Sequence, residues 1–489
     1  MKRVMIKRIN IYVLVMTCMS VLLLTACSSS DTDPLGEEGG HAERYLQLVL
    51  KAPATTSRTQ VPDTPDTAEE SMISDAEIYL VREGHITKLD IVVVSPINED
   101  SWEARSEIPE SLSPGDYYLY VVANPDMNNY NKSTYAEFVG RYDVLNPTPA
   151  WQPNHFLMVN TTNDINSIDY DATGGRKITI PTTPGVIETT LSIERLAVKV
   201  QVEDKTKENP GAITLIGSDL ICATEDNTCE VTDISITRTT LLNCVNSYNL
   251  IQKWAENNPN SGSPGTTNSK KEAWLLTPST NPDMYDIETG YYNRLLEIGT
   301  LEGLRENSWV NTGDFMYCLE NNPPMYSDEF PSNATDIPTK SKGRTTAVLI
   351  ETQITVSDCN EVQDGTIYRY GDKLYTCEEA LMANNEGLDM SNAGIQKYKE
   401  GKMYYIVWLR DDRYQVDYNG TLVEYYALFR NSWNILTVTG ISGWGDEEPS
   451  EPPTDPIDEV KIGLDTEVRV NFWKIENVTH TLGENNKIQ

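Results

Sequence analysis

The run Val460-Lys-Ile-Gly-Leu-Asp-Thr-Glu-Val-Arg-Val-Asn-Phe472, close to the C-terminus, alternates between two kinds of side chain. Every even position is Val, Ile, Leu, Thr or Phe, whereas the odd positions are charged, polar or glycine. Since successive side chains of a strand point to opposite faces, this pattern predicts a strand with one apolar face. At about 3.3 Å per residue the strand would be roughly 43 Å long, which exceeds the ordinary length of a strand. Its principal apolar positions are Val460, Ile462, Leu464, Val468, Val470 and Phe472.

An acidic, proline-rich segment, residues 446–459, precedes this run. Prolines and like charges keep such a segment extended and unable to pack. A stiff spacer followed by an overlong strand suits docking onto a sheet other than the chain's own. Residues 446–489 are therefore expected to form a spacer and a donor strand. The alternative is two short consecutive strands of the chain's own C-terminal sandwich, with a kink at Gly463.

The body of the chain carries the same signal of strand structure. Runs rich in Tyr, Val, Ile and Thr alternate with period two between clusters of Pro, Gly, Asn and Asp, as in residues 116–122 and 191–202. This pattern predicts a mostly β fold of two tandem antiparallel β-sandwiches with Greek-key connections. The breaker cluster at residues 181–185 marks the expected boundary. It gives an N-terminal sandwich over residues 59–190 and a C-terminal sandwich over residues 191–445.

A second strand with one apolar face is expected near the N-terminus, at residues 45–50. Its apolar side is formed by Leu46, Leu48 and Leu50. The next segment is rich in Pro, Thr and Ser without periodicity, which predicts an exposed, extended chain that a protease can reach. Arg58 is the only basic residue between Lys51 and Arg82, so we expect cleavage between Arg58 and Thr59. An ordinary linker that happens to contain one arginine is the alternative.

The first residues of the chain indicate export. A basic start is followed by an apolar stretch over residues 9–24 and by Leu-Thr-Ala before Cys27, which is the pattern of a secretory signal. The cysteine after these small residues resembles the lipobox of bacterial lipoproteins, in which the thiol is acylated. Residues 1–27 are therefore expected to be a lipoprotein signal peptide with Cys27 as the lipidation site. An uncleaved membrane anchor with an incidental cysteine is the alternative.

Composition excludes several classes of function. The chain has 489 residues, 39 Lys and Arg against 73 Asp and Glu, and a net charge of −34. Such an acidic chain repels phosphate backbones, so no nucleic-acid partner is expected. It has only four His and no nucleophile-elbow, zinc-protease or phosphate-loop motif, so we expect no catalytic residue and no enzyme activity.

The candidate metal ligands in the sequence are cysteines and the aspartates of an acidic loop. Six cysteines lie outside the leader and offer 15 pairings, among which the sequence cannot choose. They contain no CxxC pair, which argues against a zinc site. Calcium binding through Asp164, Asp169 and Asp171 stays open, although their spacing misses the EF-hand pattern. We predict no metal and no cofactor.

The two terminal strands explain each other if one replaces the other. Cleavage after Arg58 would free residues 28–58, a propeptide that includes the first strand. The sandwich would then keep an apolar groove between unpaired strand edges, which pair readily with another chain. Residues 460–472 of a neighbour could fill the groove by strand addition. Because this contact is head-to-tail, it would not close and would build a filament.

Several segments resemble the fimbrillins of Bacteroidales, the subunits of type V pili, and the short-fimbria (minor fimbrillin) branch in particular. Beside the cysteine motif and the terminal strands, these segments are residues 75–81, Tyr117-Tyr-Leu-Tyr-Val-Val-Ala-Asn-Pro125, His155-Phe-Leu-Met-Val-Asn160, Ile193-Glu-Arg-Leu-Ala-Val-Lys-Val200 and Arg430-Asn-Ser-Trp-Asn-Ile-Leu-Thr-Val-Thr-Gly-Ile-Ser-Gly-Trp-Gly445. Each motif is weakly specific, whereas their order and spacing are characteristic. The resemblance implies transthyretin-like sandwiches and a structural pilin subunit in a cell-surface fimbria that supports adhesion and biofilm formation.

The resemblance also implies a route and a set of partners. The precursor would be an outer-membrane lipoprotein, held by its lipid until an arginine-specific surface protease cuts it. Its partners would be other fimbrial subunits, namely further copies of itself and the tip and anchor proteins. The filament would meet a receptor on a host cell or another bacterium. The long, loop-rich region 205–445 keeps an accessory position in the filament open.

The main rival is a glycan-binding surface lipoprotein that does not polymerise. Exposed tryptophans could stack on sugars, and the candidates are Trp102, Trp151, Trp254 and Trp274. Such a module would keep its lipid and would have no use for an overlong terminal strand.

Overall fold

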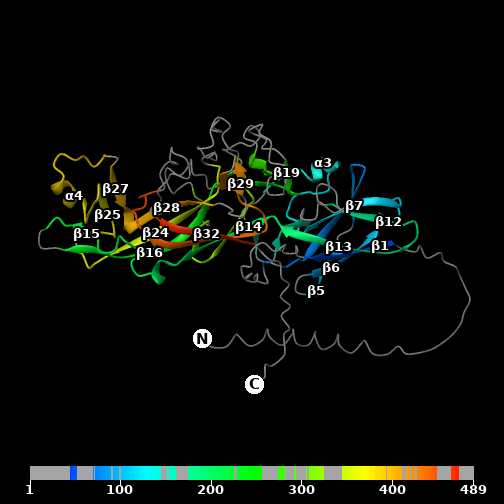
Figure 1. Cartoon of the computed structure of the whole chain (residues 1–489), viewed down its shortest axis with the longest axis horizontal. Coiled ribbons are helices and arrows are strands. Elements are labelled where there is room, and N and C mark those ends of the chain that lie inside the picture. Colours follow the sequence, from blue (N-terminus) through cyan, green and yellow to red (C-terminus); the bar gives the residue numbers. More distant parts are fainter. Residues whose placement is uncertain are drawn as a thin grey trace, which may run out of the picture. The chain divides into compact units, whose positions relative to one another are not determined.

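The computed structural model describes most of the chain from residue 44 onward. The described residues are 44–51, 70, 72–89, 92–98, 101–144, 151–152, 155–160, 175–224, 228–255, 274–280, 291–292, 304, 308–323, 344–392, 394–409, 415–418, 421–424, 427–448 and 464–472. Strands dominate them, which confirms the mostly β fold (Figure 1). In this part of the chain, no helix is both long and apolar enough to cross a membrane.

The first sheet has ten strands in the order β3-β2-β7-β11-β13-β1-β6-β5, with β12 on β7 and β4 on β2. Its strands are β1 (Arg44–Lys51), β2 (Asp75–Arg82), β3 (His85–Lys88), β4 (Val92–Val93), β5 (Ser95–Asn98), β6 (Ser101–Ile108), β7 (Gly115–Ala123), β11 (Met158–Asn160), β12 (Arg176–Ile180) and β13 (Gly185–Arg195). Leu48 of β1 and Leu119 of β7 belong to one buried cluster. The two halves of this sheet therefore close on a shared core, as in a sandwich.

The second region packs a four-stranded sheet, ordered β23-β14-β31-β32, and an eight-stranded sheet, ordered β27-β25-β26-β15-β16-β24-β28 with β22 on β16. These strands are β14 (Ala197–Asp204), β15 (Asp219–Ile221), β16 (Cys229–Leu242), β22 (Val310–Asn311), β23 (Phe315–Leu319), β24 (Ala347–Val356), β25 (Ile367–Tyr370), β26 (Lys373–Tyr375), β27 (Ile395–Tyr398), β28 (Lys402–Trp408), β31 (Ser432–Ile441) and β32 (Leu464–Phe472). Val200 of β14 and Ile350 of β24 share one buried cluster, so the two sheets enclose a common core.

Short elements complete the described chain. They are β8 (Arg141–Asp143), β9 (Trp151–Gln152), β10 (His155–Phe156), β17 (Cys244–Val245), β18 (Ser247–Asn249), β19 (Lys253–Ala255), β20 (Trp274–Leu276), β21 (Tyr291–Tyr292), β29 (Gln415–Tyr418), β30 (Thr421–Glu424), the helices α3 (Tyr135–Phe138) and α4 (Glu378–Asn384), and the 3-10 turns η1 (Thr206–Glu208), η3 (Pro278–Thr280) and η7 (Lys399–Gly401). The strands among them form two-stranded pairs.

The chain crosses from the first region to the second within a segment that the sequence predicted as one continuous run. Residues 191–202, expected as a single strand that opens the second sandwich, are divided between two sheets. β13 ends at Arg195 in the first sheet, and β14 begins at Ala197 in the second. Leu196 breaks the run because its N–H bonds to Leu157 O (3.1 Å) outside either ladder. The chain therefore passes from the first sheet to the second at Leu196.

Parallel pairs are a second departure from the expected antiparallel sandwiches. β1 runs parallel to β13, β14 to β31, and β15 to β26, while the other strand pairs are antiparallel. One disulfide, Cys229–Cys359, ties the start of β16 to the loop after β24. The remaining cysteines of the described region, Cys222, Cys244, Cys318 and Cys377, are not in disulfides.

Candidate site of strand exchange

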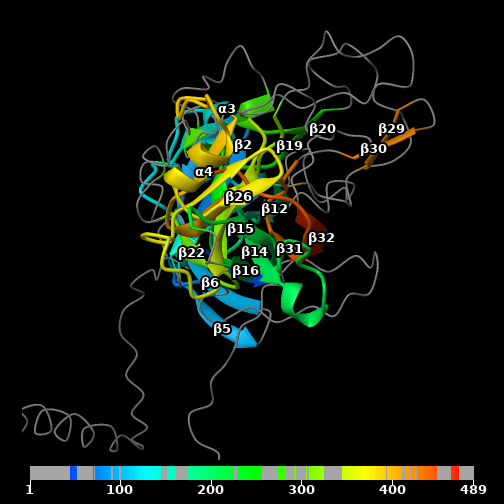
Figure 2. The ribbon, with the colours of Figure 1, turned by 90° about the vertical axis from the view of Figure 1, so that its left-hand side faces the viewer.

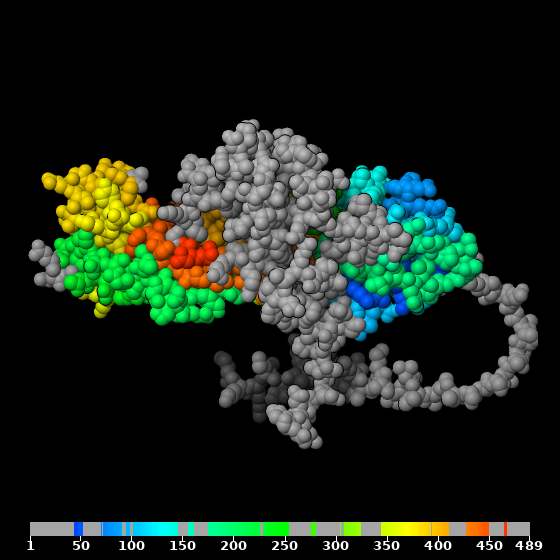
Figure 3. All heavy atoms as spheres, viewed as in Figure 1, coloured from blue at the N-terminus to red at the C-terminus, as the bar shows by residue number. Residues whose placement is uncertain are grey.

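The first strand is an interior strand of the first sheet. β1 lies between β13, with Arg44 opposite Gly185 and Lys51 opposite Ser192, and β6, with Arg44 opposite Ile108 (Figure 1). The strand therefore has hydrogen-bonding neighbours on both edges over its whole length. Part of it is also visible at the surface, as the dark blue atoms in Figure 3.

The three leucines of β1 point into the core. Leu46, Leu48 and Leu50 are each 0% exposed and belong to the cluster that fills the first sandwich. Burial of a leucine side chain stabilises a fold by roughly 1.5–3 kcal/mol, so this face contributes several kcal/mol. The alternation in the sequence therefore correctly indicated a strand with one buried face.

Polar contacts at the first residue of β1 and on its other face hold the strand in register. Arg44 donates to the carbonyls of Pro109 and Leu112 (both 3.0 Å), and Gln47 Nε2 donates to Glu103 Oε1 (2.5 Å). The Arg105 guanidinium lies over the Tyr45 ring, 4.2 Å from its centroid. These contacts join β1 mainly to β6 and to the turn that follows it.

Loss of β1 would leave an unpaired edge on both of its neighbours. Along residues 185–192, β13 is paired with β1 and with no other described strand, since β11 joins it only at residues 193–195. β6 would lose its ladder along residues 101–108 and would keep β5 on its other edge. The vacated position would thus be a slot with an apolar floor between the unpaired edges of β13 and β6.

The C-terminal strand lies on its own sheet. β32 pairs antiparallel with β31, from Ile441 opposite Leu464 to Ser432 opposite Phe472, and is an edge strand in the described region (Figure 2). Leu464 is 7% exposed and joins the second core. This intramolecular pairing agrees with the alternative interpretation of the segment. Within the single chain, β31 satisfies backbone groups along one edge of β32.

The structure does not bring the two terminal strands together, because β1 and β32 belong to different sheets and different cores. Several expected site residues lie outside the described residues, namely Cys27, Arg58, Thr59, Val460 and Ile462. Of Val468, Val470 and Phe472 the structure gives the backbone pairing with β31. The calcium candidates Asp164, Asp169 and Asp171 are also outside the described residues.

One candidate of the glycan-binding alternative is corrected by the structure. Trp102, expected among the exposed tryptophans, is 2% exposed and packs in the first core. It lies on β6 directly opposite Leu50 of β1, where an apolar side chain must face inward. It therefore has no face to offer to a sugar, while the side chains of Trp151, Trp254 and Trp274 lie outside the description.

Buried charge clusters were missed by the sequence interpretation. Glu70 is 3% exposed and forms an ion pair with Lys199 of β14 (2.7 Å between Oε2 and Nζ). Arg430 forms an ion pair with Glu320, with both side chains at most 1% exposed. The sequence held a signal for the first pair, because Lys199 interrupts the apolar run of residues 196–200.

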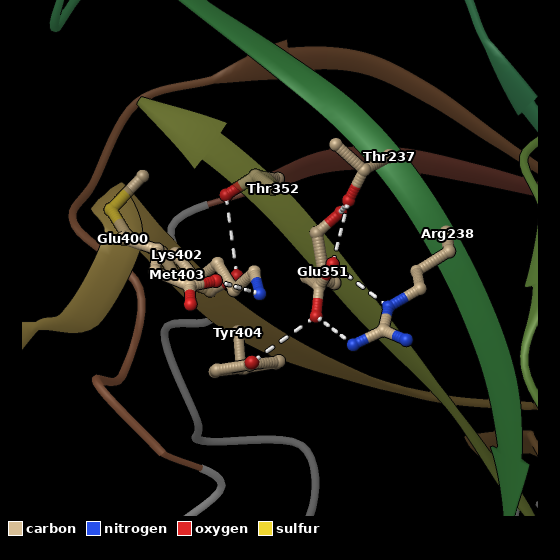
Figure 4. A network of polar contacts seen from close by, with 8 residues as sticks. All are labelled: Thr237, Arg238, Glu351, Thr352, Glu400, Lys402, Met403 and Tyr404. Atoms are coloured by element: carbon tan, nitrogen blue, oxygen red, sulfur yellow. Dashed lines mark hydrogen bonds and ion pairs between the residues drawn. The ribbon is translucent and has the colours of Figure 1, made fainter. Parts of the chain in front are cut away.

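The network in Figure 4 shows what the acidic groups of the second region do. Glu351 on β24 accepts hydrogen bonds from Arg238 Nε (2.8 Å) and Nη2 (2.6 Å), from Thr237 Oγ1 (3.0 Å) and from Tyr404 OH (3.1 Å). Trp309 covers the Arg238 guanidinium at 4.4 Å from the ring centroid. Both oxygens of this carboxylate are occupied by donors of neighbouring strands, so its role is to fasten the sheet.

A cluster of three cysteines in the second region also has a structural role. The sulfurs of Cys222, Cys229 and Cys359 lie within 4.8 Å of one another. Two of them form the disulfide, which withdraws them from metal binding. Burial raises the pKa of the Cys222 thiol, and the Glu361 carboxylate adds to this, so the reactive thiolate is disfavoured.

Comparison with known proteins connects this geometry to a family. Residues 396–479 match the family model described as "Major fimbrial subunit protein type IV, Fimbrillin, C-terminal". This match confirms the resemblance over the last strands of the second region, β31 and β32 included. No curated protein sequence matches the chain.

Solved structures with a similar arrangement are distant in sequence. A protein assigned as a cell adhesion protein from Parabacteroides distasonis has 12% identity and a TM-score of 0.42, covering 88% of this chain and 100% of that one. A FimA fimbrillin from Porphyromonas gingivalis has 14% identity and a TM-score of 0.41, covering 88% and 98%. The tip fimbrial protein Mfa3 from the same organism has 12% identity and a TM-score of 0.36, covering 88% and 100%.

Proposed function

We propose that this chain, which matches the fimbrillin family over residues 396–479, is a structural subunit of a cell-surface fimbria that assembles by strand exchange. The observation that carries the proposal is the position of β1. An interior strand with three fully buried leucines stands immediately before the segment that holds the lone Arg58. One cut in that segment would separate β1 from the rest of its sheet.

The proposed route begins with export and lipid attachment at Cys27. An arginine-specific surface protease cuts between Arg58 and Thr59, and residues 28–58 then leave with β1. A C-terminal strand from another subunit enters the slot between β13 and β6. Its side chains Leu464, Val468, Val470 and Phe472 would replace the leucine face, because both segments alternate with period two.

Exchange requires β32 to leave β31. As an edge strand it has one described partner strand, whereas an interior strand between β13 and β6 would have two. The gain of a second ladder and a buried apolar face favours transfer to the neighbour. The spacer expected at residues 446–459 begins later than the sequence predicted, because Asp446 pairs with the backbone of Tyr404 and Glu448 pairs with Lys399. The part of the spacer beyond Glu448 would supply the length that the transfer needs. The resulting fimbria would support adhesion and biofilm formation, with tip and anchor proteins and a receptor as further partners.

The test measures two properties of the surface protein: whether it forms polymers, and at which residue its N-terminus begins. Surface protein run on an unboiled gel should give a ladder, and N-terminal sequencing should begin at Thr59. Deletion of residues 460–489 should leave a folded monomer and abolish the ladder. Arg58→Lys is the matched control for charge: it keeps the cation but should block an arginine-specific cut.

A single band with a lipid-blocked N-terminus would overturn the proposal. That result would favour the non-polymerising glycan-binding lipoprotein. A ladder that persists after deletion of residues 460–489 would reject the C-terminal strand as the donor while leaving polymerisation intact.

A further inference from the structure

Glu70 is the first described residue after Arg58 in the chain, and it is buried in a dedicated site. Its Oε2 accepts from Lys199 Nζ (2.7 Å) and its Oε1 accepts from the Tyr317 hydroxyl. Its main-chain carbonyl accepts from Arg195 Nε (3.0 Å). We call Arg195, Lys199 and Tyr317 together the Glu70 socket.

The Glu70 socket is built to receive one carboxylate. Lys199 is 3% exposed, and its ammonium lies 3.6 Å from the Phe315 ring centroid and 5.0 Å from that of Trp433. Aromatic faces favour a cation but supply no negative charge, so a buried ammonium in this cage needs a counter-ion. Glu70 supplies that charge.

None of the socket residues lies on β1 or β2. Arg195 ends β13, Lys199 is on β14, and Tyr317 is on β23. Departure of β1 therefore leaves the socket complete. The chain beyond Glu70 is held again before β2 begins, because Asn124 Nδ2 donates to Met72 O (2.7 Å) and Asn124 Oδ1 accepts from Ser74 N (2.9 Å).

We infer that the Glu70 socket is the binding site that retains the new N-terminal segment after cleavage at Arg58, an inference that rests on the proposed processing. A free chain end frays unless side chains or backbone tie it down. With Glu70 bound in the socket, fraying of the new chain end does not reach β2. Ile78 and Leu80 of β2 belong to the same buried cluster as the β1 leucines, so the slot keeps the apolar core that a donor strand would cover.

The test compares cut and uncut protein in a Glu70→Gln variant, which keeps the side chain's size and removes its charge. Hydrogen exchange of the β2 amides is followed by mass spectrometry. Loss of the Glu70 charge leaves the Lys199 ammonium buried without its counter-ion, so the β2 amides should exchange faster than in the wild type in both forms. We expect this acceleration to be at least tenfold greater in cut protein than in uncut protein, in which β1 still tethers the segment. Equal acceleration in cut and uncut protein would overturn the inference.

Glu77→Gln is the matched control. Glu77 lies on β2 itself and pairs with Lys88 of the neighbouring β3. Its loss should accelerate exchange equally in cut and uncut protein, because it does not tie the chain end. A cut-dependent effect in this control would show that any weakened contact of β2 behaves like the socket, and would also overturn the inference.

Two provisions keep the outcome clear. If Glu70→Gln fails to fold, Tyr317→Phe removes a single hydrogen bond to Glu70 and should still give a smaller, severalfold acceleration confined to cut protein; its absence counts against the socket. A site for a sequence-specific protease placed at residues 56–59 makes the cut independently of natural processing. Failure of cleavage at Arg58 then contradicts the proposed function alone, while the socket is still tested.

Discussion

At the residue scale, two deeply buried ion pairs occur in the described part of the chain, Glu70 with Lys199 and Arg430 with Glu320. Arg430 donates to the carbonyls of Leu250 (3.0 Å) and Asn249 (2.7 Å) besides its ion pair with Glu320. A buried ion pair adds little over apolar packing, but loss of one partner leaves an uncompensated charge in the core. Replacing one residue of such a pair is therefore expected to lower the stability of the protein strongly.

Arg430→Met should accordingly lower the free energy of unfolding by about 3–5 kcal/mol, since Glu320 would remain buried without its partner. Denaturant unfolding followed by fluorescence measures the change. Arg141→Met is the matched control, because Arg141 pairs with Asp143 on the surface, with 44% and 66% of these side chains exposed. The control should change stability by less than about 1 kcal/mol. Similar losses in both variants would contradict the argument.

Buried tyrosines are expected to lower the stability of the fold at alkaline pH. Burial raises the pKa of both Tyr130 and Tyr248, and the Asp126 carboxylate, which accepts from both hydroxyls (2.6 and 2.8 Å), raises them further. The unfolded chain loses these protons near pH 10 while the folded chain keeps them, so stability is full below about pH 10 and falls above it. Tyrosinate absorbance should rise together with unfolding. Tyr248→Phe should move this transition to higher pH, and titration of all tyrosines without unfolding would contradict the expectation.

At the scale of elements, the two terminal strands differ in how firmly they are held. β1 has partners on both edges, whereas β32 has β31 alone among the described strands. In the proposed exchange, β1 would need a covalent cut before it could leave, whereas β32 could detach from β31 without a cut. This asymmetry would give the proposed exchange its direction.

Leu48→Ala should destabilise the precursor by about 2–5 kcal/mol, because it opens a cavity beneath an interior strand. Val49→Ala, on the half-buried opposite face of β1, should cost less than about 1.5 kcal/mol. Thermal unfolding of the precursor measures both. If residues 28–58 leave during assembly, polymer made from either variant should match the wild type. A defect that persists in the polymer would mean that β1 stays in place.

The disulfide is the other device at this scale, since it joins β16 to the loop after β24 across 130 residues. Replacing Cys229 and Cys359 together by Ser should lower stability by about 2–5 kcal/mol, mainly by relaxing the unfolded chain. Cys377→Ser, a cysteine outside the disulfide, is the control and should have a much smaller effect. Equal stability of oxidised and reduced wild-type protein would refute this role.

At the scale of the whole molecule, charge governs how subunits meet. Removal of residues 1–58 takes away 7 basic and 5 acidic residues and changes the net charge from −34 to −36. Subunits with this charge repel one another at long range, which keeps filaments dispersed and slows encounter.

Assembly of cleaved protein should therefore accelerate severalfold when salt rises from about 0.01 to 0.15 M, since the screening length falls from about 30 to 8 Å. Light scattering follows the rate, and the final polymer yield should stay the same because the joint is apolar. A rate that falls with salt would instead indicate steering by opposite charges.

The sequence by itself determined the local character of this protein. Alternation alone predicted that residues 45–50 form a strand with Leu46, Leu48 and Leu50 on a buried face, because the two-residue period of a strand is a local property. The same rule predicted a strand over residues 460–472, of which the structure describes residues 464–472 as β32. Composition and missing motifs argued against an enzyme for equally local reasons.

Only the tertiary structure decided which segments meet. It divided residues 191–202 between two sheets at Leu196, chose Cys229–Cys359 among the pairings, and placed Glu70 against Lys199. It also laid β32 along β31, where the sequence had left its partner open. The two-residue alternation of a sequence shows which face of a strand is apolar. It does not show which strand will be its hydrogen-bonding neighbour, because pairing uses backbone groups that all residues share.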